Sequence, residues 1–123
     1  MSGAKKKPKT EAAPPDLDAM VAYWQPLLRL ADWDISVGYE RHRDGSMCSR
    51  QVAYKRAKIT MQHPIDVQPG AYQHDMERVF VHELLHLHFA PFDTENDSPM
   101  GIAEEQAVES LARAFVALKR SKR

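Results

Sequence analysis

Apolar residues first recur at helical spacing between residues 16 and 30, where they form one face of a predicted helix, at Leu17, Met20, Val21, Trp24 and Leu28. Asp16 or Asp18 can cap the start of this helix. Pro26 lies inside the pattern, and an interior proline removes a backbone hydrogen bond at a cost of about 3 kcal/mol. The pattern therefore predicts a kink near Pro26, or a second short helix that begins there.

Two later segments alternate between apolar and polar residues, as half-buried strands do. Residues 33–39 alternate strictly, which predicts one strand. Residues 51–62 alternate in two parts, which predicts either two short strands that break at Lys55–Arg56 or one long bent strand. Asp44 and Gly45, between the two segments, are a typical hairpin turn pair. Residues 63–70 contain two prolines and a glycine, so they are expected to form a loop.

Two helices complete the expected domain. Residues 72 to about 89 and 98 to about 119 have helical periodicity. Ser98 followed by Pro99 is a strong start signal, because serine caps the helix and proline suits its first position. The apolar stripe of the last helix is expected at Val108, Leu111, Phe115 and Leu118. The order of helix, three short strands, helix and helix predicts an α+β fold.

Length and charge restrict the class of protein. The 123 residues suffice for one domain with a modest core, which we place at residues 16–119. Residues 1–15 are rich in lysine and proline and predict a disordered basic tail, and residues 120–123 form a basic end. There is no apolar run of membrane-spanning length and no secretory leader. With the single cysteine, Cys48, this predicts a cytoplasmic protein.

The sequence His-Glu-Leu-Leu-His lies in the predicted helix at 72–89. His82 and His86 are one turn apart, so their imidazoles can converge on one metal ion, and zinc prefers such donors. Glu83 is placed to take a proton from a water molecule. The alternative is that these are ordinary, partly buried histidines of an amphipathic helix. The three residues share a face with apolar side chains, where a carboxylate is costly unless a cation satisfies it.

The last helix offers a third ligand, because it contains Glu104, Glu105 and Glu109. Glu104 falls near the centre of the apolar stripe, and Glu105 lies about 100° to one side. A metal would explain an acid in the middle of a core-facing stripe, and the helix dipole explains it only in part. We therefore predict Glu104 as the third ligand, with Glu105 as the alternative.

The stretch "ERVFVHELLHLHF", followed after a loop by "EEQAVESLARAF", resembles the small HExxH zinc metallopeptidases of the gluzincin type. It is similar to metallopeptidases of phage and bacterial genomes, and more loosely to the SprT-like and ImmA-like groups. The resemblance implies a zincin-like fold, zinc held by His82 and His86, and Glu83 as general base. It implies a third ligand in the "EEQA" segment, where Glu104 fits best. It also implies that an edge strand near Ile59 pairs with an extended peptide.

The expected function is that of a zinc-dependent peptidase acting on a peptide or protein substrate. The alternative is a non-catalytic protein-interaction module with structural zinc or none. A fourth protein ligand, or a loop at residues 90–97 that fills the cleft, would favour the module. A membrane partner is not expected, and nucleic acid is not the favoured partner because the body lacks a basic stripe with interleaved aromatics. The sequence leaves the oligomeric state open.

Overall fold

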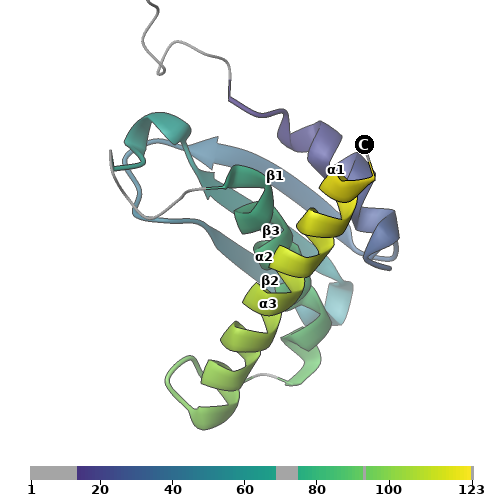
Figure 1. Ribbon diagram of the computed structural model, residues 1–123. Coiled ribbons are helices and arrows are strands. Elements are labelled where there is room, and N and C mark those ends of the chain that lie inside the picture. Colours follow the sequence, from purple (N-terminus) through teal and green to yellow (C-terminus); the bar gives the residue numbers. More distant parts are fainter. Residues whose placement is uncertain (1–13, 69–74, 93, 123) are drawn as a thin grey trace, which may run out of the picture.

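The alternating segments form a small sheet that is covered by helices (Figure 1). The computed structural model describes residues 14–68, 75–92 and 94–122. Its elements follow the predicted order, which confirms the α+β class. The predicted tail lies outside the described residues, apart from residues 14 and 15. In chain order the elements are α1 (Leu17–Leu27), β1 (Asp34–Glu40), β2 (Met47–Gln51), β3 (Arg56–Gln62), α2 (Met76–Phe89) and α3 (Pro99–Ser121).

The sheet has the strand order β1-β3-β2, so β3 is its central strand. β3 pairs in parallel with β1 and antiparallel with β2. The prediction that the strand near Ile59 is an edge is therefore wrong, because Ile59 pairs with Val37 on one side and Cys48 on the other. The edges are β1 and β2, and β2 lies between the two segments for which alternation predicted strands.

The hairpin of the sheet also differs from the prediction. Asp44 and Gly45 do lie in a turn, but it joins β1 to β2, and these strands do not pair with each other. The hairpin instead joins β2 to β3 through a 3-10 turn at Val52–Tyr54, followed by Lys55 in the left-handed conformation with φ of 50°. The chain therefore breaks at residues 52–55, slightly before the predicted break.

The first helix is shorter than predicted, and no second helix begins at Pro26. The Asp16 carboxylate caps it by accepting from the Ala19 N–H at 3.1 Å, which confirms one of the two expected caps. Pro26 lies in the last turn, and the helix ends one residue later. The chain then turns inward, so that Leu28, Leu30 and other large apolar side chains join the core.

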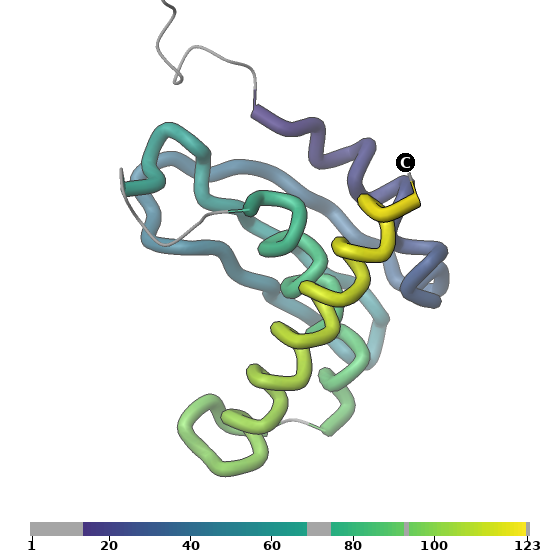
Figure 2. Tube along the Cα trace, in the orientation of Figure 1, coloured from purple at the N-terminus to yellow at the C-terminus, as the bar shows by residue number. Residues whose placement is uncertain are grey.

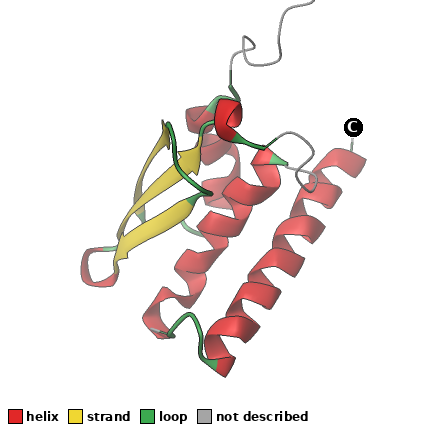
Figure 3. Cartoon of the chain, turned by 90° about the vertical axis from the view of Figure 1, so that its left-hand side faces the viewer, coloured by secondary structure: helices red, strands yellow, loops and turns green. Residues whose placement is uncertain are grey.

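Helix α2 lies between the sheet and α3 (Figure 3). This position explains its apolar character on more than one side, since five of its residues are buried, namely Phe80, Val81, Leu84, Leu85 and Leu87. The buried stripe of α3 consists of Gly101, Glu104, Val108, Ala112 and Val116. The predicted stripe was therefore partly wrong, because Leu111 and Leu118 are exposed. No helix in the described ranges is long and apolar enough to cross a membrane.

The loop before α3 packs closely on the first turn of that helix. The Ser98 hydroxyl oxygen accepts from the Gly101 N–H at 3.0 Å, which confirms the predicted cap. A Cβ atom at position 101 would lie 2.0 Å from the carbonyl oxygen of Glu95. Only glycine therefore allows the backbone of this loop to approach α3 so closely.

Candidate metal centre

Helix α2 carries both histidines of the motif. Its start is capped by Asp75, whose carboxylate accepts from the Arg78 N–H at 3.2 Å. Buried leucines on the other faces of the helix hold its rotation, so His82 and His86 turn toward α3. Their ring centroids are 5.0 Å apart, as one helical turn requires, and their side chains are 18% and 12% exposed. The two imidazoles therefore line the inner wall of a cleft.

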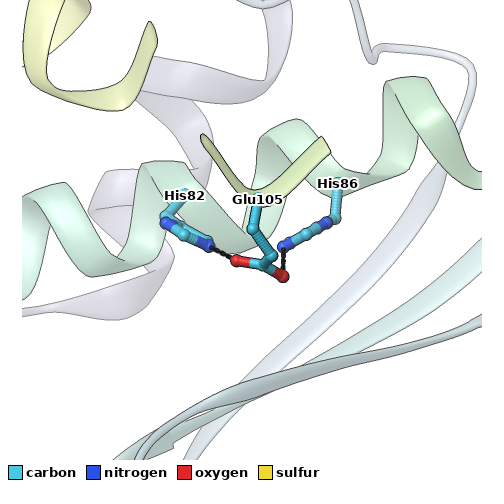
Figure 4. A group of neighbouring side chains, drawn as sticks. All are labelled: His82, His86 and Glu105. Carbon is cyan, nitrogen blue, oxygen red and sulfur yellow. Dashed lines mark hydrogen bonds and ion pairs between the residues drawn. The ribbon is translucent and has the colours of Figure 1, made fainter. Parts of the chain in front are cut away.

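The Nε2 atoms of both rings converge on the carboxylate of Glu105 (Figure 4). One oxygen of Glu105 lies 3.0 Å from Nε2 of His82, and the other lies 3.1 Å from Nε2 of His86. Ligand atoms of the three residues all lie within 4.8 Å of one another. Two imidazole nitrogens and a carboxylate on adjacent helices are the donor set of many catalytic zinc sites.

The opposite ring nitrogens are held by two further carboxylates. Nδ1 of His82 lies 2.8 Å from an oxygen of Glu109, and Nδ1 of His86 lies 2.8 Å from an oxygen of Glu104. Metal-binding histidines commonly donate this N–H to a carboxylate, which fixes the tautomer and the orientation of the ring. The two glutamates therefore present Nε2 of each ring to the cleft.

The four ring nitrogens together provide a test of whether a cation fits this site. A carboxylate oxygen only accepts hydrogen bonds, and each of the four nitrogens faces one. Each nitrogen must then carry a proton, or share a cation with the carboxylate. The Nδ1 atoms can keep their protons. A divalent cation between the two Nε2 atoms and Glu105 would replace the protons on the Nε2 atoms. The residues present therefore fit a zinc ion.

Glu104 lies where the periodicity predicted, but its contacts differ from those of Glu105. It is only 9% exposed, and its oxygens accept from the Thr94 hydroxyl and from Nδ1 of His86. Burial raises its pKa, but these two hydrogen bonds and the nearby charges of His86 and Arg50 together lower it more, so the pKa lies below its usual value. The structure thus brings Glu105, not Glu104, to the two Nε2 atoms. The assignment of Glu104 as a metal ligand stays a prediction, which the geometry does not favour.

The cleft in front of the histidines has a volume of about 450 Å³. It lies between α2, the start of α3, the loop that carries Thr94 and Asn96, and strand β2. Glu83 also lines it, and burial raises the pKa of this carboxyl above its usual value, although the adjacent histidines oppose the rise. A carboxylate with a raised pKa is a better proton acceptor, as a general base needs to be.

Two contributions to this site were not predicted from the sequence. Glu109 also accepts hydrogen bonds from Arg78 and Arg113, which places its carboxylate beside His82. Its position one turn beyond Glu105 was the available signal, because residues four apart share a helix face. Thr94 gave no signal, since it lies in an irregular loop. His88 points away as predicted and contacts the carbonyl oxygen of Leu28 at 2.6 Å.

Comparisons of the chain with protein-family models, with curated proteins and with solved structures found no match. The resemblance to zinc peptidases therefore depends on the motif and its sequence context. The geometry of the two histidines and the surrounding carboxylates is an independent observation, because it comes from the folded chain. Any function proposed for this protein has to be argued from that geometry.

Proposed function

We propose that this protein is a zinc-dependent peptidase. The observation that carries the proposal is the convergence of both Nε2 atoms on Glu105, with each Nδ1 atom held by a separate carboxylate. Ligands and orienting groups are both present, which an incidental pair of surface histidines would not require. His82, His86 and Glu105 would hold the ion, so Glu105 takes the place that the sequence pattern gave to Glu104.

The remaining residues have roles that follow from their positions. When bound, zinc would polarise the scissile carbonyl and acidify a water molecule. Glu83, in the wall of the same cleft, would accept the proton of that water and pass it to the leaving amine. Glu109 and Glu104 would keep the imidazoles oriented. The cleft is bordered by β2, and an extended peptide can add to an edge strand.

The rival function, a non-catalytic interaction module, is less well supported by the site. Thr94 and Asn96 line the cleft but leave a volume of about 450 Å³ open beside the histidines. A cavity of this size is in the range that accommodates small ligands or a few peptide residues. A structural zinc site would instead be closed by four protein ligands.

The first test is zinc content, measured by elemental analysis after dialysis against zinc and then buffer. We expect one zinc ion per chain in the wild type, loss in Glu105→Ala, and retention in Glu104→Gln with affinity weakened roughly 10- to 100-fold. Circular dichroism would check that each variant is folded. Zinc lost in Glu104→Gln but kept in Glu105→Ala would restore the original assignment, and no zinc in the wild type would refute the peptidase.

The second test separates catalysis from metal binding. Glu83→Gln should keep its zinc and lose cleavage of a mixed pool of quenched peptides by at least about 100-fold, because proton transfer by a positioned group contributes that much. Glu40→Gln is a suitable control, since Glu40 is exposed on β1 and does not line the cleft. Unchanged cleavage by Glu83→Gln would show that another group accepts the proton.

A further inference from the structure

Strand β2 places an arginine inside the proposed active-site cleft. Cys48 and Arg50 are half-buried, whereas Met47, Ser49 and Gln51 are exposed. Across the hairpin, Cys48 pairs with Ile59 and Arg50 pairs with Ala57, and both partners belong to the buried core. Residues paired across two strands share a face of the sheet. Arg50 therefore points to the helix-covered side, and it lines the cleft together with His82, His86 and Glu105.

The guanidinium of Arg50 has no partner within the described ranges of the chain, where it forms neither a hydrogen bond nor an ion pair. It only lowers the pKa of Glu104 and of Cys48 through space. At the opposite end of the sheet, Arg41 contacts Asp66 and Arg43 contacts Glu40, so both of these arginines are paired. A half-buried charge without a partner is unusual and needs an explanation.

The two glutamates of α3 that line the cleft already have other partners. Both oxygens of Glu105 face the histidines, and those of Glu104 accept from Thr94 and His86. Arginine presents a planar set of donors that matches a carboxylate with two parallel hydrogen bonds. The guanidinium of Arg50 can therefore bind a carboxylate of a ligand beside the candidate metal ligands.

We propose that Arg50 binds a carboxylate of the peptide substrate and so makes the protein selective for acidic peptides. This inference rests on the proposed peptidase function. A peptide that adds to β2 would pass Arg50 on its way along the cleft. The carboxylate is either the side chain of an aspartate or glutamate near the scissile bond or the free C-terminus of the peptide.

An inward-facing charge on an edge strand also has a purely protective explanation, because it discourages pairing with another copy of the sheet. That role predicts a different consequence. Substitution of Arg50 would then promote self-association, which size-exclusion chromatography detects, and would leave the preference among peptides unchanged.

The test compares three sets of short quenched peptides with mixed neutral sequences. The first is amidated and contains one internal glutamate, the second has glutamine in its place, and the third is the neutral set with a free C-terminal carboxylate. We expect the zinc-loaded protein to show kcat/KM roughly 10- to 100-fold higher for the first or the third set than for the second. This factor corresponds to the stabilisation that hydrogen bonds between two charged groups provide. The favoured set identifies the source of the carboxylate.

Arg50→Gln should reduce this ratio to about one, and Arg50→Lys should restore part of it. Lys58→Gln is the matched control, because it removes a positive charge from the exposed face of the same sheet. A ratio near one in the wild type, or an unchanged ratio in Arg50→Gln, would overturn the inference even if zinc binding and cleavage are established.

Binding provides a second measurement that does not depend on turnover. The same three peptide sets would be titrated into zinc-loaded Glu83→Gln protein, with and without Arg50→Gln, by fluorescence anisotropy. Tighter binding of one carboxylate set, lost in the double variant, supports the role of Arg50 even in a protein that cleaves none of the peptides. Equal binding of all three sets, or no binding of any, overturns it.

Discussion

Two adjacent glutamates at the start of α3 have different environments. Glu104 is on the buried stripe and is 9% exposed, whereas the Glu105 side chain is 54% exposed. Glu104 orients His86 through the Nδ1 atom, which faces away from the cleft, and Glu105 contacts the Nε2 atoms of both rings from the cleft. A rotation of about 100° between neighbouring helix positions is enough to separate the two roles.

The thiol of Cys48 should be unreactive although it lines the cleft. Burial and, to a lesser degree, the nearby Glu83 raise its pKa to about 12, and only the thiolate reacts with alkylating agents. We expect iodoacetamide at about pH 8 to label the native protein at least about 100-fold more slowly than the urea-unfolded chain. Mass spectrometry over time provides the rates. Equal rates in the two states would show that the thiol is accessible and ionised.

The sequence brings His82, Glu83 and His86 together on one helix, but it did not indicate which acid of α3 contacts both Nε2 atoms. His82, Glu83 and His86 are fixed relative to one another by a single helix. Periodicity placed Glu104 on the buried stripe correctly, although it also placed Leu111 there, which is 40% exposed. It could not show that the buried position brings Glu104 to Nδ1 of His86, whereas Glu105 reaches both Nε2 atoms from the cleft. Which ring nitrogen each acid meets depends on how α3 packs against α2, and helical periodicity does not determine that packing.

At the level of elements, the start of α3 depends on the loop that precedes it. The loop carries Thr94, whose hydroxyl donates to Glu104, and it approaches the helix at Gly101. The loop thereby supports the carboxylate that orients His86. A change at Gly101 should consequently affect both stability and the metal site.

Gly101→Ala should destabilise the protein by about 1–3 kcal/mol, because the new methyl group would collide with a backbone oxygen that cannot rotate away. It should also weaken zinc binding by displacing Thr94. Gly38→Ala is a suitable control, since nothing lies within 4 Å of an added Cβ there. Urea denaturation gives the stability and a chelator competition gives the affinity. Equal stability of the two variants would contradict the close approach at Gly101.

The strands show where local patterns were insufficient. The alternation at residues 33–39 predicted β1 correctly, and Trp33 and Ile35 do belong to the core or its border. β2 was not predicted, because Ser49 and Gln51 are polar and Arg50 occupies an inward position. Strand order was also beyond the sequence pattern, since Asp44–Gly45 is a turn that does not close a hairpin. Residues 47–51 form a strand because they pair with β3. Their composition alone does not favour one.

For the molecule as a whole, Glu77 connects all three helices. Its carboxylate accepts from the indole N–H of Trp24 on α1 and from Lys119 and Arg120 on α3. The end of α3 consequently lies beside α1 (Figure 2). Burial raises the pKa of Glu77, but the hydrogen bonds from Lys119 and Trp24 lower it more, so the pKa lies below 4.5.

A lowered pKa in the folded state means that ionised Glu77 stabilises the fold at neutral pH, and that this stabilisation disappears as the pH falls through the lowered pKa. Glu77→Gln should therefore be less stable than the wild type by roughly 1 kcal/mol at pH 7, and the difference should shrink as the pH falls through the lowered pKa of Glu77. Urea titrations followed by tryptophan fluorescence measure both values. Glu40→Gln, on the exposed β1 pair with Arg43, should have little effect.

The close approach at Gly101 also gives this protein a recognisable sequence signature. Glycine at 101 is required by backbone contact, Ser98 by the helix cap, and the acids at 104, 105 and 109 by the histidines they contact. Because one helix carries them all, their spacing cannot vary without dismantling the cleft. A protein with H-E-x-x-H followed by S-P-x-G-x-x-E-E-x-x-x-E would be expected to share this architecture, whatever the rest of its chain. That pattern offers a route to relatives of this protein that overall similarity does not detect.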